Sequence, residues 1–366
     1  MLDASAEGAV GHIELADWPD LIIVAPATAD LLARAAHGRA NDLASCVLLA
    51  TQAPVLWAPA MNTNMWRHPA TRSNLARLRE FGASFVGPDA GALACGWVGE
   101  GRMIDPEFIV DAACRLLASR QPGNPWAGRR VLVSAGPTRT YLDPVRFITN
   151  ASTGSMGYAL AAAAYELGAD VTLVSGPVDR PSPRGVERVD VTTARELLDA
   201  MEERLSAGER TVDLVAMVAA VGDLEVEQPS AGKLGKQALI QSLATTRWRA
   251  AVDILKTLVA RHGARTRFLG FAAQTAEGDA AEVERELVRL GAAKLAAKGA
   301  HALFVNRVGV PGLGFSSSTN AGHLLVRGAD GDEEELEVMP SGPPVEKLEL
   351  ARWILERLGE RLWRAA

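Results

Sequence analysis

The chain has 366 residues, enough for two domains of ordinary size, and its composition, 48% hydrophobic and 22% charged, excludes a disordered protein. Its 38 basic and 44 acidic residues give a net charge of -6, which argues against a nucleic-acid partner held by bulk charge. The three cysteines form neither a metal-spaced pair nor a disulfide framework, so a cytoplasmic protein is expected.

The N-terminal region predicts neither a signal peptide nor a membrane anchor. Residues 1–17 carry acidic side chains and no lysine or arginine, the reverse of the basic start of a signal peptide. The uncharged stretch 43–66 is long enough to span a bilayer, but prolines and asparagines interrupt it, which favours a buried helix followed by a buried strand. No membrane partner is therefore expected.

Strand-like and helix-like segments alternate through residues 1–120, after a polar, acidic stretch that precedes the first strand. The predicted strands are Leu21–Ala25, Val55–Ala58 and Ser84–Val86, and the predicted helices are Ala29–Ala36, Asp42–Thr51, Thr71–Phe81 and Pro106–Ser119. This alternation indicates a parallel α/β sheet. The Pro- and Gly-rich segment 121–129 that follows is typical of a linker between domains.

The same alternation restarts over residues 130–366. The predicted strands are Arg130–Ala135, Asp170–Val174, Leu214–Val218, Arg267–Phe271 and Ala302–Val305. The predicted helices are Gly154–Leu167, Ala194–Ser206, Ala251–Arg261, Ala280–Lys298 and Pro344–Trp363, with a hairpin of His323–Val326 and Glu334–Val338 before the last helix. The sequence therefore predicts the α/β class, with two doubly wound, Rossmann-like or flavodoxin-like parallel-sheet domains joined by the linker.

The first domain lacks the opening that an α/β nucleotide or flavin domain usually has, a strand followed by a glycine-bearing phosphate loop. Either this domain binds no nucleotide, or its first strand–helix unit is missing from the sequence. The segment Pro26–Asp30 follows a predicted strand and opens a helix, so backbone N–H groups and the Thr28 hydroxyl could hold a phosphate. An ordinary helix cap at Thr28 is the favoured alternative.

Three further residues of the first domain are candidates for chemistry. Asn62 lies in a polar loop after the second strand, where its amide could donate a hydrogen bond to a substrate carboxylate. The alternative is that Asn62 only stabilises a turn in this loop. Cys95 lies in a glycine-rich segment, 91–102, which predicts a mobile flap. On such a flap the Cys95 thiol could act as a general acid. The alternative is that Cys95 is a small, buried hydrophobic residue. His12 suits proton abstraction, although a capping or surface histidine is commoner.

Two patterns in the second domain point to anion binding. Three polar segments (133–139, 143–146 and 148–157) surround the start of an Ala-rich helix, where a helix N-terminus could face phosphate oxygens. Only six of the 38 basic residues are lysine, and four of them fall in two close pairs, Lys233 with Lys236 and Lys294 with Lys298. Lysine offers a compact charge that arginine does not reproduce, so these positions are candidate phosphate contacts.

Several motifs of the first half occur together in one known family. Pro59–Trp66 matches a P-x-M-N-x-x-M-W motif, 94–102 a substrate flap, Pro26–Asp30 a flavin-side motif, and 11–13 the segment with an active-site histidine. With these motifs the chain resembles the flavin-containing cysteine decarboxylases. It resembles more closely, over essentially its whole length, the bacterial bifunctional phosphopantothenoylcysteine decarboxylase/phosphopantothenate–cysteine ligases of coenzyme A synthesis.

For the first half, the resemblance implies FMN-dependent decarboxylation of phosphopantothenoylcysteine to 4'-phosphopantetheine. FMN would oxidise the cysteinyl group so that CO₂ is lost, and Cys95 would supply the final proton. Asn62 would hold the substrate carboxylate, His12 would assist, and Pro26 and Thr28 would contact the cofactor. The family's N-terminal flavin-loop segment, roughly sixty residues, has no counterpart here.

For the second half, the resemblance implies that CTP activates 4'-phosphopantothenate as an acyl-cytidylate, from which cysteine displaces CMP, with Mg²⁺ as the accompanying ion. Asn150 corresponds to the residue that handles the acyl-cytidylate. The implied nucleotide contacts are Met217, Val218, Ala219, Asp223, Lys233, Phe271, Lys294 and Lys298. The family also implies a homo-oligomer, with a trimeric decarboxylase half and a dimeric ligase half.

The second half departs from the family pattern at several positions. Ser155 replaces a lysine, Ala251 replaces an asparagine, and Arg307 replaces an aspartate. Two alternatives to the bifunctional enzyme therefore stay open. One is a ligase whose decarboxylase half is disabled, and the other is a non-catalytic, flavoprotein-like regulatory subunit.

Overall fold

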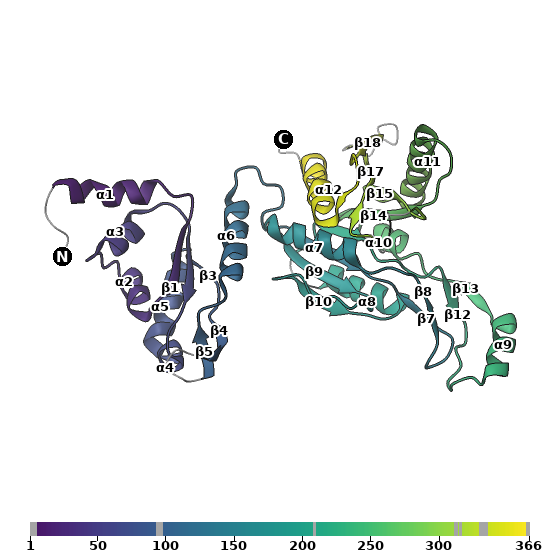
Figure 1. Ribbon diagram of the computed structural model, residues 1–366, viewed down its shortest axis with the longest axis horizontal. Coiled ribbons are helices and arrows are strands. Elements are labelled where there is room, and N and C mark those ends of the chain that lie inside the picture. The colour runs from purple at the N-terminus through teal and green to yellow at the C-terminus, as the bar shows by residue number, and fades with distance from the viewer. Residues whose placement is uncertain are drawn as a thin grey trace. The chain divides into compact units, whose positions relative to one another are not determined.

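The computed structural model describes residues 6–92, 98–207, 210–310, 314, 317–328 and 336–363. The chain forms two compact units, Met1–Pro122 and Gly123–Ala366, each of which has its own sheet (Figure 1). No helix of the described residues is long and apolar enough to cross a membrane.

The first unit is built on a three-stranded parallel sheet in the order β1-β2-β3. These strands are β1 (Ile22–Ala27), β2 (Val55–Pro59) and β3 (Ser84–Phe85), and a separate hairpin comprises β4 (Asp89–Ala92) and β5 (Val98–Arg102). The helices are α1 (Ala6–Asp17), α2 (Ala29–Ala36), α3 (Leu43–Ala50), α4 (Thr63–Arg67), α5 (Pro69–Glu80) and α6 (Pro106–Arg120).

Alternating residues of β2 face two layers of helices. Trp57 packs into a buried cluster with residues of α2 and α5, among them Leu32 and Leu75. Leu56 and Ala58 point the other way, into a cluster with residues of α6. A sheet with helices on both faces confirms the doubly wound α/β arrangement predicted for this half.

Three elements of the first unit differ from the predictions. The acidic N-terminal stretch forms helix α1, and the carbonyl of Ala16 at its end accepts a 2.8 Å hydrogen bond from the Thr51 hydroxyl. The polar loop after β2 contains the short helix α4, which Asn62 caps. The glycine-rich flap is flanked by paired strands β4 and β5, so interstrand hydrogen bonds order its two arms.

The second unit contains an eight-stranded sheet in the order β10-β9-β6-β11-β14-β15-β17-β18. Its strands are β6 (Arg130–Ala135), β9 (Asp170–Ser175), β10 (Glu187–Asp190), β11 (Leu214–Met217), β14 (Arg267–Gln274), β15 (Ala302–Arg307), β17 (Gly322–Arg327) and β18 (Leu336–Pro340). The covering helices are α7 (Ser155–Glu166), α8 (Ala194–Ser206), α10 (Ile254–His262), α11 (Ala280–Lys298) and α12 (Lys347–Leu362).

The first six strands of this sheet are parallel, and the last two continue it as the predicted antiparallel hairpin. Along the chain, the strand order runs outward from β6 to β10 and then returns to β11 on the other side of β6. The sheet therefore has its topological switch point between β6 and β11, where α/β sheets bind ligands at the carboxyl ends of their strands.

The two faces of this sheet are covered by different helices. Val131 and Val133 of β6 pack into a core with α7 and α12, while Leu132 packs into a second core with α8, α10 and α11. Helix α7 approaches β6 closely at Gly157, where a Cβ would lie 2.6 Å from the Cβ of Ala135. Glycine at this position brings the N-terminus of α7 next to the switch point.

Several short elements lie outside the main sheet and were not predicted. The hairpin of β7 (Arg139–Tyr141) and β8 (Phe147–Thr149) lies beside that of β12 (Leu224–Val226) and β13 (Trp248–Ala250), which encloses α9 (Lys236–Thr245), at one end of the unit (Figure 1). β16 (Thr319–Asn320) pairs with β19 (Val345–Glu346). The helix predicted from Ala251 begins at Ile254, because Asp253 caps it through the Lys256 N–H.

Candidate functional site

A cavity of about 340 Å³ opens at the carboxyl ends of β11 and β14. Most of the nucleotide contacts predicted from the sequence line it, although they come from three separate segments of the chain: Met217, Ala219, Asp223, Phe271, Lys294 and Lys298. We call this cavity the nucleotide pocket. Its position beside the switch point is where an open parallel sheet binds nucleotides.

The two lysines of the nucleotide pocket differ in whether they form an ion pair. Lys298 is ion-paired with Asp253, whose other carboxylate oxygen accepts the N–H of Lys256 at the start of α10. Lys294, one turn before Lys298 on the exposed side of α11, has no ion pair among the described residues. Asp223 is exposed at the rim. Lys294 is therefore the more available of the two lysines for an anionic group.

Side chains of neighbouring elements hold the backbone that follows β11. The buried Ser134 hydroxyl accepts hydrogen bonds from the N–H groups of Val218 and Ala219, both at 3.1 Å. The Asn150 side-chain Nδ2 donates to the carbonyls of Ala220 (3.0 Å) and Val221 (3.1 Å). Asn150 Oδ1 has no partner in the described part of the chain, so it remains an exposed hydrogen-bond acceptor beside the nucleotide pocket.

Lys233 does not line the nucleotide pocket within one chain. It is exposed on the loop between β12 and α9, and its neighbour Leu234 is held by two side chains from the loop between β7 and β8. The buried Asp143 carboxylate accepts the Leu234 N–H (3.1 Å), and Arg146 Nη1 donates to the Leu234 carbonyl (3.0 Å). The structure thus places the Lys233 loop through long-range contacts that the sequence did not reveal.

The arginines of two segments expected to bind anions, Arg139 and Arg146, make contacts of their own within the hairpin and the Lys233 loop. The Arg139 guanidinium lies 4.2 Å from the ring centroid of Phe147, and Arg146 is engaged with Asp143 and the Leu234 carbonyl. Burial raises the pKa of Asp143, but three backbone N–H groups and Arg146 outweigh it and hold the pKa below its usual value. Both arginines therefore stabilise the hairpin and the loop beside it.

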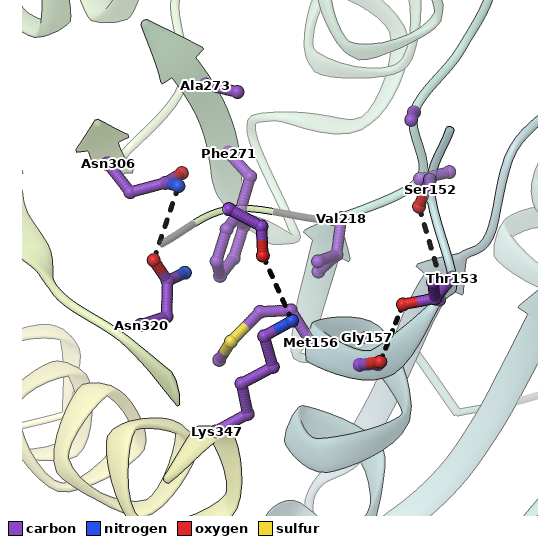
Figure 2. A pocket seen from close by; sticks show the side chains of 15 residues that line it. Ser152, Thr153, Met156, Gly157, Val218, Phe271, Ala273, Asn306, Asn320 and Lys347 are labelled. Carbon is purple, nitrogen blue, oxygen red and sulfur yellow. Dashed lines mark hydrogen bonds between the residues drawn. The ribbon is translucent and has the colours of Figure 1, made fainter. Parts of the chain in front are cut away.

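A second cavity of about 130 Å³ shares Ala219 and Phe271 with the nucleotide pocket (Figure 2). It is bounded by the N-terminal turn of α7 on one side and by Asn306, Asn320 and Lys347 on the other. The sequence analysis missed these last three residues. The scarcity of lysine in the sequence was a usable signal for Lys347.

In the first unit, the hairpin that flanks Cys95 packs against the Asn62 loop. The Met61 N–H donates to the Gly101 carbonyl (2.9 Å), and a Cβ on Gly101 would lie 2.2 Å from the Met61 carbonyl oxygen. Asn62 Oδ1 accepts the Asn64 N–H at 2.8 Å. Cys95 itself lies outside the described residues. Strand β5, which follows it, therefore lies against the Asn62 loop.

The remaining predicted residues of the first unit lie at different places. Pro26 is the next-to-last residue of β1, two residues before Thr28, whose hydroxyl accepts the Leu31 N–H at 3.2 Å as the cap of α2. His12 lies on α1, whose end is tied to Thr51, before β2, whereas Asn62 follows the carboxyl end of β2. α1 and α4 lie at opposite ends of the unit (Figure 1), so one chain does not bring His12 to Asn62.

Comparison with known proteins identifies both halves of the chain. The family model of the DNA/pantothenate metabolism flavoprotein C-terminal domain matches residues 126–361, and the flavoprotein model matches residues 2–118. The coenzyme A biosynthesis bifunctional protein CoaBC of Escherichia coli strain K12 is 44% identical over 333 residues, which cover 91% of this chain and 78% of that protein. The chain belongs to the CoaBC family.

Another CoaBC relative agrees with this assignment, and a solved structure is also similar. The Bacillus subtilis strain 168 protein is 40% identical over 331 residues, covering 90% of this chain and 77% of that protein. A crystal structure of the C-terminal domain of a CoaBC protein matches with a TM-score of 0.49 and 32% identity, covering 64% of this chain and 96% of that one. The predicted family and the α/β fold class are confirmed.

Proposed function

We propose that the chain is a bifunctional enzyme of coenzyme A biosynthesis, in which the second unit ligates 4'-phosphopantothenate to cysteine at the expense of CTP. In the first step a carboxylate oxygen of 4'-phosphopantothenate attacks the α-phosphorus of CTP, and pyrophosphate leaves. In the second step the cysteine amine attacks the acyl carbon of the acyl-cytidylate, and CMP leaves with the former carboxylate oxygen.

The observation that carries this proposal is the gathering of Asp223, Phe271, Lys294 and Lys298 in one pocket at the carboxyl edge of the sheet. The Phe271 ring offers an apolar surface for the cytosine base. The charge of Lys294, which forms no ion pair within the described part of the chain, suits the phosphates together with that of Lys298. Electrostatic contacts of this kind lower the barrier because negative charge moves onto the departing pyrophosphate.

The described residues fit a magnesium ion that arrives with the nucleotide. They contain no group of three or more His, Cys, Asp or Glu side chains arranged to hold a metal. Mg²⁺ is commonly held by one or two carboxylates together with substrate phosphates. The exposed Asp223 at the rim of the pocket is the carboxylate that we assign to this role, since Asp253 is engaged with Lys298.

Asn150 is assigned to the second step. Its Nδ2 is occupied by the carbonyls of Ala220 and Val221, which leaves Oδ1 as the polar atom available to a ligand. An acceptor oxygen suits the N–H groups of the attacking cysteine amine, and it holds that amine in line with the acyl carbon. The residue would therefore orient the nucleophile rather than stabilise a negative charge.

For the first unit we propose FMN-dependent decarboxylation of the ligase product. The residues present fit the cofactor at the start of α2, because the first N–H groups of that helix have no acceptor within it and can bind an oxygen beside Pro26 and Thr28. When bound, FMN supplies the oxidation and the return of a hydride. Asn62 holds the substrate carboxylate, and Cys95 protonates the product.

The family's homo-oligomeric state fits both units. In the second unit the elements outside the main sheet expose apolar side chains: Val145, Ile148, Leu224 and Ile240. In the first, Trp18 and Ile23 are exposed, and His12 is remote from Asn62 within one chain. We propose a cytoplasmic enzyme with dimeric contacts through the second unit and trimeric contacts through the first.

The test of the proposed function is product release. With CTP and 4'-phosphopantothenate alone, pyrophosphate should form up to one equivalent per site, and CMP should appear only when cysteine is added. Bound FMN, and conversion of the ligated product to 4'-phosphopantetheine, would support the bifunctional enzyme. Pyrophosphate release without decarboxylation would favour a ligase alone, and the absence of both reactions would favour the regulatory subunit.

A further inference from the structure

A cavity of about 590 Å³ lies in the first unit, at the opposite edge of the sheet from the Asn62 loop. It is lined by Pro54 and Ala83, which precede β2 and β3, and by the ends of α2, α3 and α5. Asn62 follows the carboxyl end of β2, so this cavity lies at the amino ends of the same strands. We call it the amino-edge cavity. Its volume is in the range of sites that bind small organic molecules.

The inner wall of the amino-edge cavity is apolar. It is formed by side chains that belong to the buried cluster around Trp57 or pack against it: Ala35, Ala36, Leu48, Val55, Trp57 and Leu78. At the cavity, Leu49 and Phe81 remain 60% and 64% exposed. Contact between apolar area and water costs free energy, which an apolar ligand would recover by covering that area. The wall and these two residues therefore suit an aliphatic chain.

The charged side chains of the amino-edge cavity are all basic. Arg39, Arg77 and Arg120 line it together with His37, and no aspartate or glutamate does so among the described residues. Arg77 donates to His37 Nδ1 at 3.4 Å, and its guanidinium lies 5.7 Å from the ring centroid of Phe81. The side chains of Arg39 and Arg120 have no partner within the part of the chain that the structure describes. Positive charges without a counter-charge attract an anionic group.

Capping of the helix ends does not account for these arginines. An arginine near the end of a helix often donates to its last carbonyls. Here backbone N–H groups fill that role, because Gly38 donates to the Ala35 carbonyl at 3.2 Å and Gly82 donates to the Arg79 carbonyl at 2.9 Å. Both glycines have a positive φ, 63° and 87°, which permits these turns. The guanidinium of Arg39 is therefore available to a ligand.

We propose that the amino-edge cavity binds a small monocarboxylic acid with an aliphatic chain. The chain covers the apolar wall, and the carboxylate meets the guanidinium groups of Arg39, Arg77 and Arg120. Because this cavity lies at the opposite edge of the sheet from the Asn62 loop, its ligand does not compete with the proposed decarboxylation chemistry. It is a binding site in addition to the two proposed active sites.

The experiment uses calorimetry on the full chain with three probes: octanoate, octan-1-ol and octylammonium. They share one eight-carbon chain and differ in the charge of the head group. At pH 7 we expect octanoate to bind about tenfold more tightly than octanol, the sum of three exposed charge pairs, and octylammonium to bind most weakly. Added salt should weaken the binding of octanoate but not that of octanol, because salt screens exposed charges.

Variants at exposed positions test the two parts of the site separately. Arg39→Gln combined with Arg120→Gln should lower the affinity for octanoate about fivefold and leave that for octanol unchanged. Leu49→Gln should weaken both probes alike, because it removes apolar area. Arg72→Gln, which changes an exposed arginine of α5 outside the cavity, is the matched control and should alter neither.

Three results would overturn the inference. The first is equal affinity of the wild-type chain for octanoate and octanol, or no binding of either. The second is an octanoate preference that the paired arginine variant leaves unchanged. The third is displacement of octanoate by FMN, which would place the carboxylate in the cofactor site instead.

Discussion

The Asp143 carboxylate accepts a hydrogen bond from the Leu234 N–H, 3.1 Å away and 91 residues later in the chain. The same carboxylate oxygen accepts Arg146 Nη1, and Arg146 in turn donates to the Leu234 carbonyl. Both polar backbone groups of Leu234 are thus fixed by side chains of another segment. Because Lys233 is the preceding residue, this contact sets where its loop lies. Asp143 and Arg146 are therefore positioning residues for Lys233.

Asp143→Asn should release the Lys233 loop. Asp143 Oδ1 accepts the Val145 and Arg146 N–H groups, so the amide nitrogen of asparagine would replace Oδ2 and face the donors of Leu234 and Arg146. We expect pyrophosphate release to fall about tenfold, the loss of one hydrogen bond to a charged group. Asp199→Asn, which alters an exposed ion pair on α8, serves as the control.

A double-mutant cycle separates positioning from general destabilisation. If Asp143 acts through Lys233, the Lys233→Gln and Asp143→Asn effects should be strongly non-additive, because either change alone removes the same contact. Additive effects on pyrophosphate release would show that the two residues act independently.

Lys233→Gln should abolish most acyl-cytidylate formation, and Lys256→Gln should be nearly silent. Removing a lysine from the developing negative charge should cost roughly 2–4 kcal/mol of barrier, whereas an exposed helix lysine should matter by less than about 0.5 kcal/mol. The measurement is pyrophosphate release from CTP with 4'-phosphopantothenate, for both variants side by side. Equal rates in the two variants would remove Lys233 from the mechanism.

Cys95→Ser should leave CO₂ release largely intact and block formation of the saturated product. A serine hydroxyl is far too weak an acid to replace a thiol in protonating the product. The assay compares evolved CO₂ with the yield of 4'-phosphopantetheine in the FMN-loaded protein. Wild-type yields of 4'-phosphopantetheine from the variant would exclude Cys95 as the proton donor.

His301→Asn should reduce the loss of the free energy of unfolding that the second unit shows as the pH falls below neutrality. Burial, with Arg267 and Arg327 nearby, lowers the pKa of His301 to about 4. Since the unfolded chain then binds more protons, the free energy of unfolding is fully present above about pH 6.5 and is lost as the pH falls toward 4. The Asn amide oxygen keeps the acceptor that His301 Nδ1 provides to the Phe268 N–H.

The expected difference in this pH dependence is about 2 kcal/mol, reduced from the full linkage value because the imidazole is partly exposed to water. Denaturant unfolding of wild type and variant at pH 7 and pH 4.5 measures it. If the two proteins lose the same stability between these values, the titration of His301 does not contribute.

The sequence predicted the elements whose patterns are local and missed contacts between distant segments. Strand β6 and helix α7 were predicted because alternating or periodic apolar residues mark a buried face. The hydrogen bond from the Leu234 N–H to Asp143 joins two loops that are far apart in the sequence. No local sequence pattern predicts such a contact. Lys347 was missed for a similar reason, because its burial depends on the short β16–β19 pair that places the start of α12 beside Asn320.

Oxygen-18 in the carboxylate of 4'-phosphopantothenate tests the central claim most directly. If the second unit activates this carboxylate as an acyl-cytidylate, one labelled oxygen should be found in CMP for each molecule of product formed with cysteine. The pyrophosphate should carry no label, because it leaves before the acyl transfer. Label in inorganic phosphate, with CDP as the nucleotide product, would contradict the account, since it would place the attack at the γ-phosphorus.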